Sequence, residues 1–352
     1  MKIGIDASRY SHEQATGVEN YSKQIIDAIQ RNVSADDEVV LYTRENLKAK
    51  RLWTLRALTK EMRKNPPDVL FVPSHVFPLR LPERSVITIH DVAFMHLKEV
   101  YSFFQYHYLK WSTKYAVKHA DKIIVPSKAT RDDLESYFKC PAEKIAVIPH
   151  GFTPPSGIKD LKFADVDFCK HFGIDNNTKY FLFVGRLESK KNLERLVEAF
   201  AKFSEKHDDY KLLLAGKRGV GFQDIVKKIG ELKLAEKVVI PGYVDNNEKA
   251  LLFKHCIAFT FPSLYEGFGL PLLEAFYYGK PALCSDFSAL PEVAGRACCL
   301  IDPEDTNAIA SGLEKLATDP EYVEALVAEG KNRLGEFSWE TSAKQTLKVL
   351  HG

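Results

Sequence analysis

The stretch Glu266-Gly-Phe-Gly-Leu-Pro-Leu-Leu-Glu274 places two carboxylates eight positions apart, with two glycines and a proline between them. The preceding run, Ile257–Pro262, is apolar and β-rich, which is typical of a buried strand. The following run, Leu270–Tyr278, is typical of a helix, because Pro271 suits its first turn and Gly279 suits the position after its last turn. The pattern therefore predicts a strand, a glycine-rich turn and a helix N-terminus.

A helix that begins just after a strand presents free backbone N–H groups and the positive end of its dipole, which suits an anion such as a phosphate. Glu266 lies in the predicted turn, and Glu274 lies about one turn inside the helix. Two carboxylates beside an anion site favour a polyol ligand, since its hydroxyls need such acceptors. The alternative is an ordinary strand–helix junction with two solvated glutamates.

The same alternation of short apolar runs and helical patterns continues along the whole chain, which indicates βαβ units and parallel sheets. The predicted strands are Lys2–Asp6, Val39–Thr43, Val69–Pro73, Val86–His90, Lys122–Pro126, Ile145–Pro149, Tyr180–Gly185, Lys211–Gly216, Val238–Gly242, Ile257–Pro262, Ala282–Ser285 and Ala297–Asp302. We expect an α/β protein with two Rossmann-like, doubly wound domains facing a cleft. Ligands of such sheets bind beyond the carboxyl ends of the strands.

The length of 352 residues favours two domains over one core. The best linker candidate is Phe152-Thr-Pro-Pro-Ser-Gly157, so we predict domains over residues 1–158 and 159–336. A last helix over 337–352 carries an apolar stripe that should pack against another part of the chain. Its members are Trp339, Ala343, Leu347 and Leu350.

Composition limits the class of protein. The net charge of +2 does not favour nucleic-acid binding, and no apolar run is long enough to span a membrane. The chain begins with a strand and no apolar leader, and its six cysteines show no metal-binding spacing. We therefore expect a reduced, cytoplasmic protein, with buried free thiols at Cys284, Cys298 and Cys299, which lie in strand-like runs.

Further candidate residues follow other strands. Gly185, Arg186 and Lys191 follow the strand that opens the second half, where the two cations suit a diphosphate. Lys191 is expected in the first turn of the next helix, and Lys190 competes with it for the same role. Tyr243 and Val244 follow another strand and could line a base pocket.

In the first half, His90 ends a strand and could bind substrate hydroxyls. The alternative is a histidine whose hydrogen bonds are satisfied within the protein. Gly17 precedes the first long helix, where a glycine would let backbone approach a ligand closely. The loop Gly216–Gly221 lacks the GxGxxG order of a dinucleotide fold, and we expect it to be flexible.

Together these residues resemble glycosyltransferase family 4, whose members are retaining enzymes that use nucleotide sugars and have the two-domain GT-B fold. The matching positions are Gly17, His90-Asp91, Pro149-His150-Gly151, Gly185-Arg186 with Lys191, and Glu266 to Glu274. They cover essentially the whole chain in the order of the family. Asparagine is common in the family at the position of His150, and Gly-x-Gly-Pro is common where this chain has Gly216-Lys-Arg-Gly219, which leaves the donor base open.

The resemblance implies a role for each matching residue. Arg186 and Lys191 would bind the donor diphosphate, Glu274 the ribose and Glu266 the donor sugar. His90 would contact the sugar from the acceptor domain, and the last helix would cross back to that domain. Backbone amides of Phe268, Gly269 and Leu270 would contact sugar and phosphate, with Gly17 and Gly185 nearby and Tyr243 and Val244 beside the base.

The resemblance also implies the reaction, which is transfer of a hexose from a GDP- or UDP-sugar without metal or cofactor. The opening residues favour mannose, and the acceptor would be a glycan or a lipid-linked saccharide. The alternatives are a GT-B epimerase and a non-catalytic subunit that binds nucleotide sugars. An NAD-dependent oxidoreductase would also suit Rossmann domains, but its fingerprint is missing.

Two basic, aromatic segments could rest on a membrane surface, which would make the protein a peripheral one. For Arg51–Lys64, membrane contact and core packing remain equally open. For Val100–Lys118, we expect ordinary core packing with the lysines outside.

Overall fold

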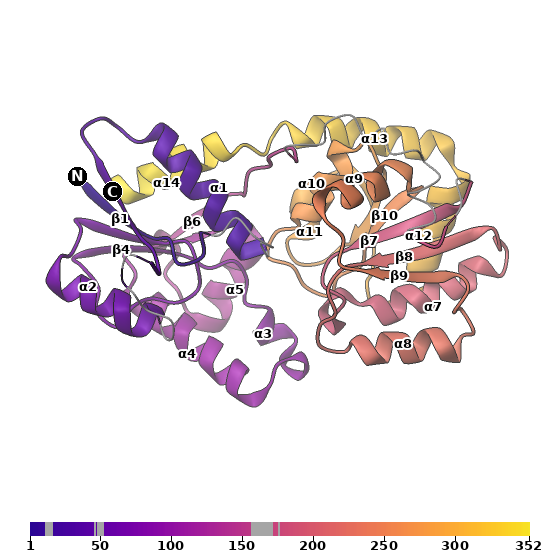
Figure 1. The fold of residues 1–352 in the computed structure, drawn as a ribbon, viewed down its shortest axis with the longest axis horizontal. Coiled ribbons are helices and arrows are strands. Elements are labelled where there is room, and N and C mark those ends of the chain that lie inside the picture. Colours follow the sequence, from indigo (N-terminus) through magenta and orange to yellow (C-terminus); the bar gives the residue numbers. More distant parts are fainter. Residues whose placement is uncertain (11–16, 46, 48–52, 156–171, 175–176) are drawn as a thin grey trace. The chain divides into compact units, whose positions relative to one another are not determined.

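The computed structural model describes residues 1–10, 17–45, 47, 53–155, 172–174 and 177–352. These residues form two compact units, which are described separately (Figure 1). Unit 1 comprises Met1–Thr153 and Phe337–Gly352, and unit 2 comprises Pro154–Glu336. In this part of the chain, no helix combines the length and the apolar character that crossing a membrane requires.

Unit 1 is a parallel six-stranded sheet in the order β2-β1-β3-β4-β5-β6. Its strands are β1 Lys2–Asp6, β2 Glu38–Tyr42, β3 Val69–Val72, β4 Arg84–Thr88, β5 Lys122–Val125 and β6 Ile145–Val147. Its helices are α1 Gly17–Asn32, η1 Trp53–Leu58, α2 Thr59–Lys64, α3 Ala93–His96, η2 Lys98–Val100, α4 Phe103–His119, α5 Lys128–Phe138, η3 Ala142–Lys144 and α14 Trp339–His351.

The sheet of unit 1 is buried on both faces, as its continuous apolar strands require. Ile3, Val69 and Phe71 contribute to a core on the side of α1 and α14. Leu70 and Val72, which alternate with them along β3, contribute to a core that includes residues of α2, α3 and α4. The expected stripe on the last helix is fully used, since Trp339, Ala343, Leu347 and Leu350 all belong to the first core.

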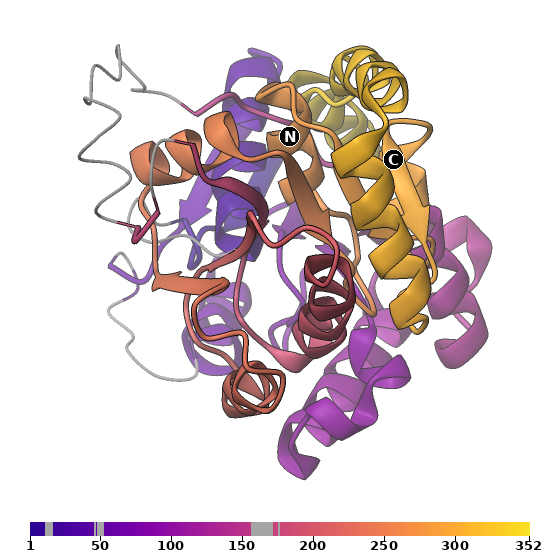
Figure 2. The same ribbon diagram turned by 90° about the vertical axis from the view of Figure 1, so that its right-hand side faces the viewer.

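Unit 2 repeats the architecture, with a parallel sheet in the order β12-β11-β10-β7-β8-β9. Helices surround the strands of this sheet (Figure 2). Its strands are β7 Lys179–Val184, β8 Tyr210–Ala215, β9 Val238–Gly242, β10 Ala258–Phe261, β11 Ala282–Ser285 and β12 Cys298–Ile301. Its helices are η4 Ser189–Lys191, α7 Leu193–Ser204, α8 Phe222–Glu231, α9 Asn246–His255, α10 Leu270–Tyr277, α11 Leu290–Ala294, α12 Thr306–Thr318 and α13 Pro320–Leu334.

All twelve strands predicted from the sequence are present, and the α/β prediction with two doubly wound sheets is confirmed. The expected free, buried thiols are also present at Cys284, Cys298 and Cys299, and Cys140 and Cys256 are free and buried as well. Cys169 lies outside the described residues.

The two basic, aromatic segments differ in their packing. In the described part of the first, Trp53 and Leu58 are buried in the core of unit 1. Arg51 and Leu52 lie outside the described residues. In the second, the expectation of core packing is wrong for the side chains that α4 leaves exposed. Phe103 is 71% exposed, Phe104 83%, Tyr108 42% and Trp111 44%.

Candidate functional site

The loops that follow β7 and β8 are joined through their backbones. Leu187 N–H donates to the carbonyl of Lys217, and Gly219 N–H donates to the carbonyl of Leu187, both at 2.9 Å. Gly216 allows this approach, because a Cβ there would lie 1.7 Å from the carbonyl oxygen of Gly185. The segment Gly216–Gly221 therefore supports the one that carries Arg186.

Lys191 is the last residue of the short helix η4, so the expected position in the first turn of α7 is wrong. Asn192 lies between η4 and α7 and has a left-handed backbone conformation, with a φ of 59°. Its buried amide donates to the carbonyls of Pro262 at 3.1 Å and Pro303 at 2.7 Å. Asn192 thus fixes the turn that presents Lys191 to the ends of β10 and β12. Sequence reasoning missed this role, although an asparagine before a helix was a usable signal.

Lys191 and Glu266 form an ion pair that joins the carboxyl ends of β7 and β10. The two side chains are only 13% and 12% exposed. Burial alone would raise the pKa of Glu266, but the nearby charges of Lys191 and Lys190 lower it below its usual range. Glu266 is therefore a carboxylate at neutral pH, held beside a cation at the edge of the sheet. Because the strand order reverses between β10 and β7, this edge is the switch point where open α/β sheets bind ligands.

The main chain around Glu266 is held by the loop between β11 and α11. Glu266 N–H donates to Ser288 Oγ at 3.0 Å, and its carbonyl accepts from Ala289 N–H at 3.3 Å. Three residues further along, Gly269 directly precedes α10 and has a φ of 122°. A Cβ at this position would lie 2.7 Å from Leu290 Cδ2, so the turn requires glycine. The predicted strand, glycine-rich turn and helix are all present here, with Phe268 buried and Leu270 as the first residue of α10.

Glu274 lies in α10 and accepts a 2.5 Å hydrogen bond from Lys249 Nζ of α9. Both side chains are partly accessible, at 22% and 18%. The sequence singled out Glu274 but not Lys249, because 25 residues separate them along the chain. Each of the two glutamates of the opening motif thus has a lysine partner.

The other predicted donor residues of unit 2 lie at neighbouring strand ends. Arg186 is 53% exposed, with its Nε 3.9 Å from Glu188. Tyr243 follows β9 and is 54% exposed, with Lys217 Nζ 4.7 Å from the centre of its ring. The next residue, Val244, is buried. Gly185 lies directly after the last residue of β7. The carboxyl edge of this sheet therefore carries cations, carboxylates and an aromatic ring, which are the groups a nucleotide sugar needs.

His90 and Gly17 belong to unit 1. His90 is 7% exposed, and its Nε2 donates to the carbonyl of Pro73 at 3.1 Å. Burial and the neighbouring His75 lower its pKa to about 3, so the ring is neutral. The ring packs edge-on against Tyr21 of α1, at 4.7 Å between centres, and also lies 5.5 Å from His150. Gly17 begins α1, and a Cβ there would meet nothing within 4 Å, so packing does not require a glycine at this position.

Comparisons with known proteins agree with this geometry. Two family models match the chain, Glycosyltransferase Family 4 over residues 16–154 and Glycosyl transferases group 1 over residues 167–333. The O-antigen chain mannosyltransferase B of Escherichia coli is 30% identical over 283 residues, which are 79% of this chain and 72% of that protein.

Two solved structures show the same fold. Sucrose-phosphate synthase from Thermosynechococcus elongatus matches with a TM-score of 0.77 and 21% identity, over 100% of this chain and 98% of that one. Anabaena HepE, in a complex with UDP and glucose, matches with a TM-score of 0.71 and 19% identity, over 100% and 99%. The two Rossmann-like units have the GT-B fold, and the chain belongs to glycosyltransferase family 4.

Proposed function

We propose that this glycosyltransferase moves a hexose from a nucleotide sugar to a saccharide acceptor, and that this hexose is mannose. The configuration at the anomeric carbon is retained. The observation that carries the proposal is the Lys191–Glu266 pair at the switch point of the sheet in unit 2. The choice of mannose is supported by the 30% identity to an O-antigen chain mannosyltransferase. A nucleoside diphosphate donor is supported by the HepE complex with UDP.

The donor is proposed to bind along the carboxyl edge of unit 2. Arg186 and Lys191 contact the diphosphate, together with the backbone N–H groups at the start of α10. Glu274 accepts hydrogen bonds from the ribose hydroxyls, and Glu266 accepts one from a hydroxyl of the sugar. The exposed Tyr243, with Val244, lies near the base.

Catalysis is proposed to rest on stabilisation of the leaving group. The bond between the anomeric carbon and the diphosphate oxygen breaks, and the acceptor oxygen bonds to the same face of that carbon. The acceptor proton passes to the departing diphosphate. Arg186 and Lys191 neutralise the negative charge that develops there, so no metal ion is needed. His90, on the acceptor unit, contacts the donor sugar as a neutral imidazole.

The acceptor is proposed to be a glycan carried at a membrane surface, so that the protein is peripheral to the membrane. Helix α4 supports this view, because it contains Lys110, Lys114 and Lys118 but no acidic residue. Its exposed Phe103 and Phe104 would enter the lipid interface while the lysines attract anionic headgroups.

The test is turnover of a panel of GDP-, UDP- and ADP-sugars in EDTA with a short saccharide acceptor, measured as nucleoside diphosphate release and as glycosylated product. We expect a single preferred donor, GDP-mannose. Lys191→Ala should lower kcat by about 10²–10³-fold, as the loss of one charge-stabilising donor typically does. Lys206→Ala, which removes an exposed lysine of the same unit, is the matched control.

The outcomes separate the alternatives. Lys190→Ala shows which of the adjacent lysines contacts the phosphates. Full activity of Lys191→Ala would contradict the proposed site, and restoration by Mg²⁺ of activity lost in EDTA would contradict metal independence. Release of an epimerised sugar without a glycosidic product would favour an epimerase instead.

A further inference from the structure

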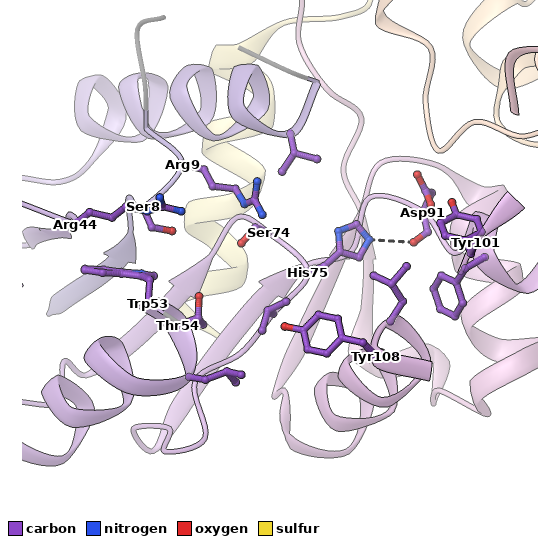
Figure 3. A pocket seen from close by; sticks show the side chains of 15 residues that line it. Ser8, Arg9, Arg44, Trp53, Thr54, Ser74, His75, Asp91, Tyr101 and Tyr108 are labelled. Atoms are coloured by element: carbon purple, nitrogen blue, oxygen red, sulfur yellow. Dashed lines mark hydrogen bonds between the residues drawn. The ribbon is translucent and has the colours of Figure 1, made fainter. Parts of the chain in front are cut away.

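Unit 1 contains a cavity of about 410 Å³ at the carboxyl edge of its own sheet (Figure 3). Residues following four neighbouring strands line it, namely Ser8 and Arg9 after β1, Arg44 after β2, Ser74 and His75 after β3, and Asp91 after β4. The strand order reverses between β1 and β3, so this cavity also lies at a switch point. Its position is therefore that of a ligand site, distinct from the donor residues of unit 2.

Two guanidinium groups enter this cavity, and neither has a strong partner among the residues that the structure describes. Arg9 Nη1 lies 3.9 Å from Glu19 Oε1, which is too long for a hydrogen bond. Arg44 makes no ion pair within the part of the chain that the structure describes. Figure 3 shows both arginines on one side of the pocket and Tyr101 and Tyr108 on the other.

Two nearby carboxylates each accept hydrogen bonds through one oxygen. Asp91 Oδ1 accepts from the N–H of Ala93 at 3.0 Å. Asp6 Oδ1 accepts from two lining residues, from Trp53 Nε1 at 3.1 Å and from Ser8 N–H at 2.9 Å. Burial raises the pKa of Asp6 above its usual range. The cavity is thus positively charged on the side of Arg9 and Arg44.

We propose that this cavity binds the acceptor through a phosphate or diphosphate group on the saccharide, held by Arg9 and Arg44. This inference rests on the proposed transferase function and names the acceptor class for it. A carboxylate matches the fork of one guanidinium, whereas a phosphate has enough oxygens and charge for two guanidiniums that come from different strands. Ser8 and Ser74 can donate further hydrogen bonds, and the Tyr108 ring offers a flat apolar surface to the sugar.

Helix α4 connects this cavity to the membrane face proposed above. Tyr108 and Leu109 line the cavity, while Phe103 and Phe104 lie exposed near the start of the same helix. A phosphate that links a saccharide to a lipid would lie at the membrane surface, beside this helix. The same chemistry is also present in a water-soluble sugar phosphate, so the experiment must separate the two sources.

The first measurement is hydrogen exchange of the full chain with inorganic pyrophosphate as the probe. We expect protection of peptides containing Ser8–Arg9 and Ser74–His75, and its loss in Arg9→Gln/Arg44→Gln. Protection around Gly185–Lys191 should persist, because pyrophosphate can also occupy the donor site. If protection in unit 1 were absent, or unchanged in the double variant, the proposal would be wrong whether or not any donor is turned over.

The second measurement compares three acceptors built on one saccharide. They are the free sugar, its soluble 1-phosphate and a lipid-linked diphosphate in vesicles of phosphatidylethanolamine and phosphatidylglycerol. The double variant should raise the KM for phosphorylated acceptors by at least about tenfold, because charge-assisted hydrogen bonds are lost. The KM for the nucleotide sugar should not change.

Matched variants make the kinetic result specific. Arg44→Lys keeps the charge but loses the planar fork, so its effect should be intermediate. Arg56→Gln removes an exposed arginine of η1 that does not line the cavity, and it should behave as the unaltered protein does. The proposal would be overturned if the double variant and the unaltered protein had the same KM values for the free and the phosphorylated sugar. It would also be overturned if a uronic acid competed with the acceptor as strongly as the sugar phosphate does. Preference for the vesicle-borne acceptor over the soluble phosphate identifies a lipid-linked source.

Discussion

The position of Lys191 depends on the residue that follows it. Asn192 occupies a left-handed backbone conformation, which asparagine tolerates better than most residues do. Its amide satisfies two carbonyls that lie 70 and 111 residues away in the sequence. Asn192 therefore helps to determine the position of Lys191, the cation that we propose to bind the phosphates.

Asn192→Ala should lower both stability and activity. The two buried carbonyls lose their donor and the left-handed turn becomes strained, which together should cost about 2–4 kcal/mol of unfolding free energy. Nucleoside diphosphate release should also fall, because Lys191 is no longer held against Glu266. Urea denaturation and donor turnover measure the two effects.

Asn192→Gly separates the two causes, since glycine accepts the left-handed backbone but lacks the amide. If the amide matters most, both variants should lose a similar fraction of kcat. Unchanged kcat in both variants would show that Asn192 does not position the lysine.

Much of the donor edge could be predicted from the sequence, but the partners of its residues could not. Gly269, Pro271 and the two glutamates form a local pattern, so their turn and helix follow from backbone preferences. The contacts of Lys249 with Glu274 and of Asn192 with Pro303 join segments that only the folded sheet brings together. No local pattern specifies such pairs, and sequence reasoning missed both.

At the scale of elements, strands were easier to predict than exposed helix faces. Short apolar, β-rich runs identified all twelve strands, and the inner strands β3 and β10 are fully buried. Helix α4 contains aromatic residues all around its surface, so its periodicity does not distinguish a buried face from an exposed one. The prediction of core packing failed there for Phe103, Phe104, Tyr108 and Trp111.

Elements of unit 1 also enclose a pair of buried histidines, which should make its stability depend on pH. His90 follows β4 and His150 follows β6, and Tyr21 of α1 contacts both. Burial and the nearby His75 ring lower the pKa of His90 to about 3. Burial and the nearby His90 ring lower the pKa of His150. In the unfolded chain both rings take up protons near pH 6.5, whereas in the folded unit they stay neutral.

The unfolded state therefore binds more protons below pH 6.5, and stability is full above that pH and declines as pH falls toward 3. Between pH 7.5 and 5.5, each histidine should contribute a loss of about 1.4 kcal/mol. Urea denaturation at both values measures the sum, before most carboxylates titrate. His150→Phe keeps an aromatic ring without the titration and should remove about half of the loss. If the unfolding free energy of this variant depended on pH as that of the unaltered protein does, groups other than His150 would be responsible for the loss.

At the scale of the whole molecule, the chain leaves unit 1 after Thr153 and returns to it at Phe337. The two passages are hydrogen-bonded, since Phe152 N–H donates to the carbonyl of Phe337 at 3.2 Å. Gly151 lets the returning chain pass, because a Cβ there would lie 2.2 Å from Trp339 N. Ser342 Oγ donates to the carbonyl of Pro149 at 2.6 Å, which adds a further link between α14 and the end of β6. The last helix is thus a structural part of unit 1, although unit 2 precedes it in the sequence.

Truncation of the Trp339 side chain tests this division of the chain. Trp339 is 3% exposed and packs with Tyr21, His150 and the α1 face of the core, so Trp339→Ala should cost unit 1 about 3–5 kcal/mol. Because the residues proposed to bind the donor belong to unit 2, the affinity for a nucleoside diphosphate should change little. Hydrogen exchange should report faster opening of β1, β3 and α1, with β7 and β10 unaffected. Equal acceleration in both sheets would mean that the two units unfold as one, and that α14 stabilises the whole chain.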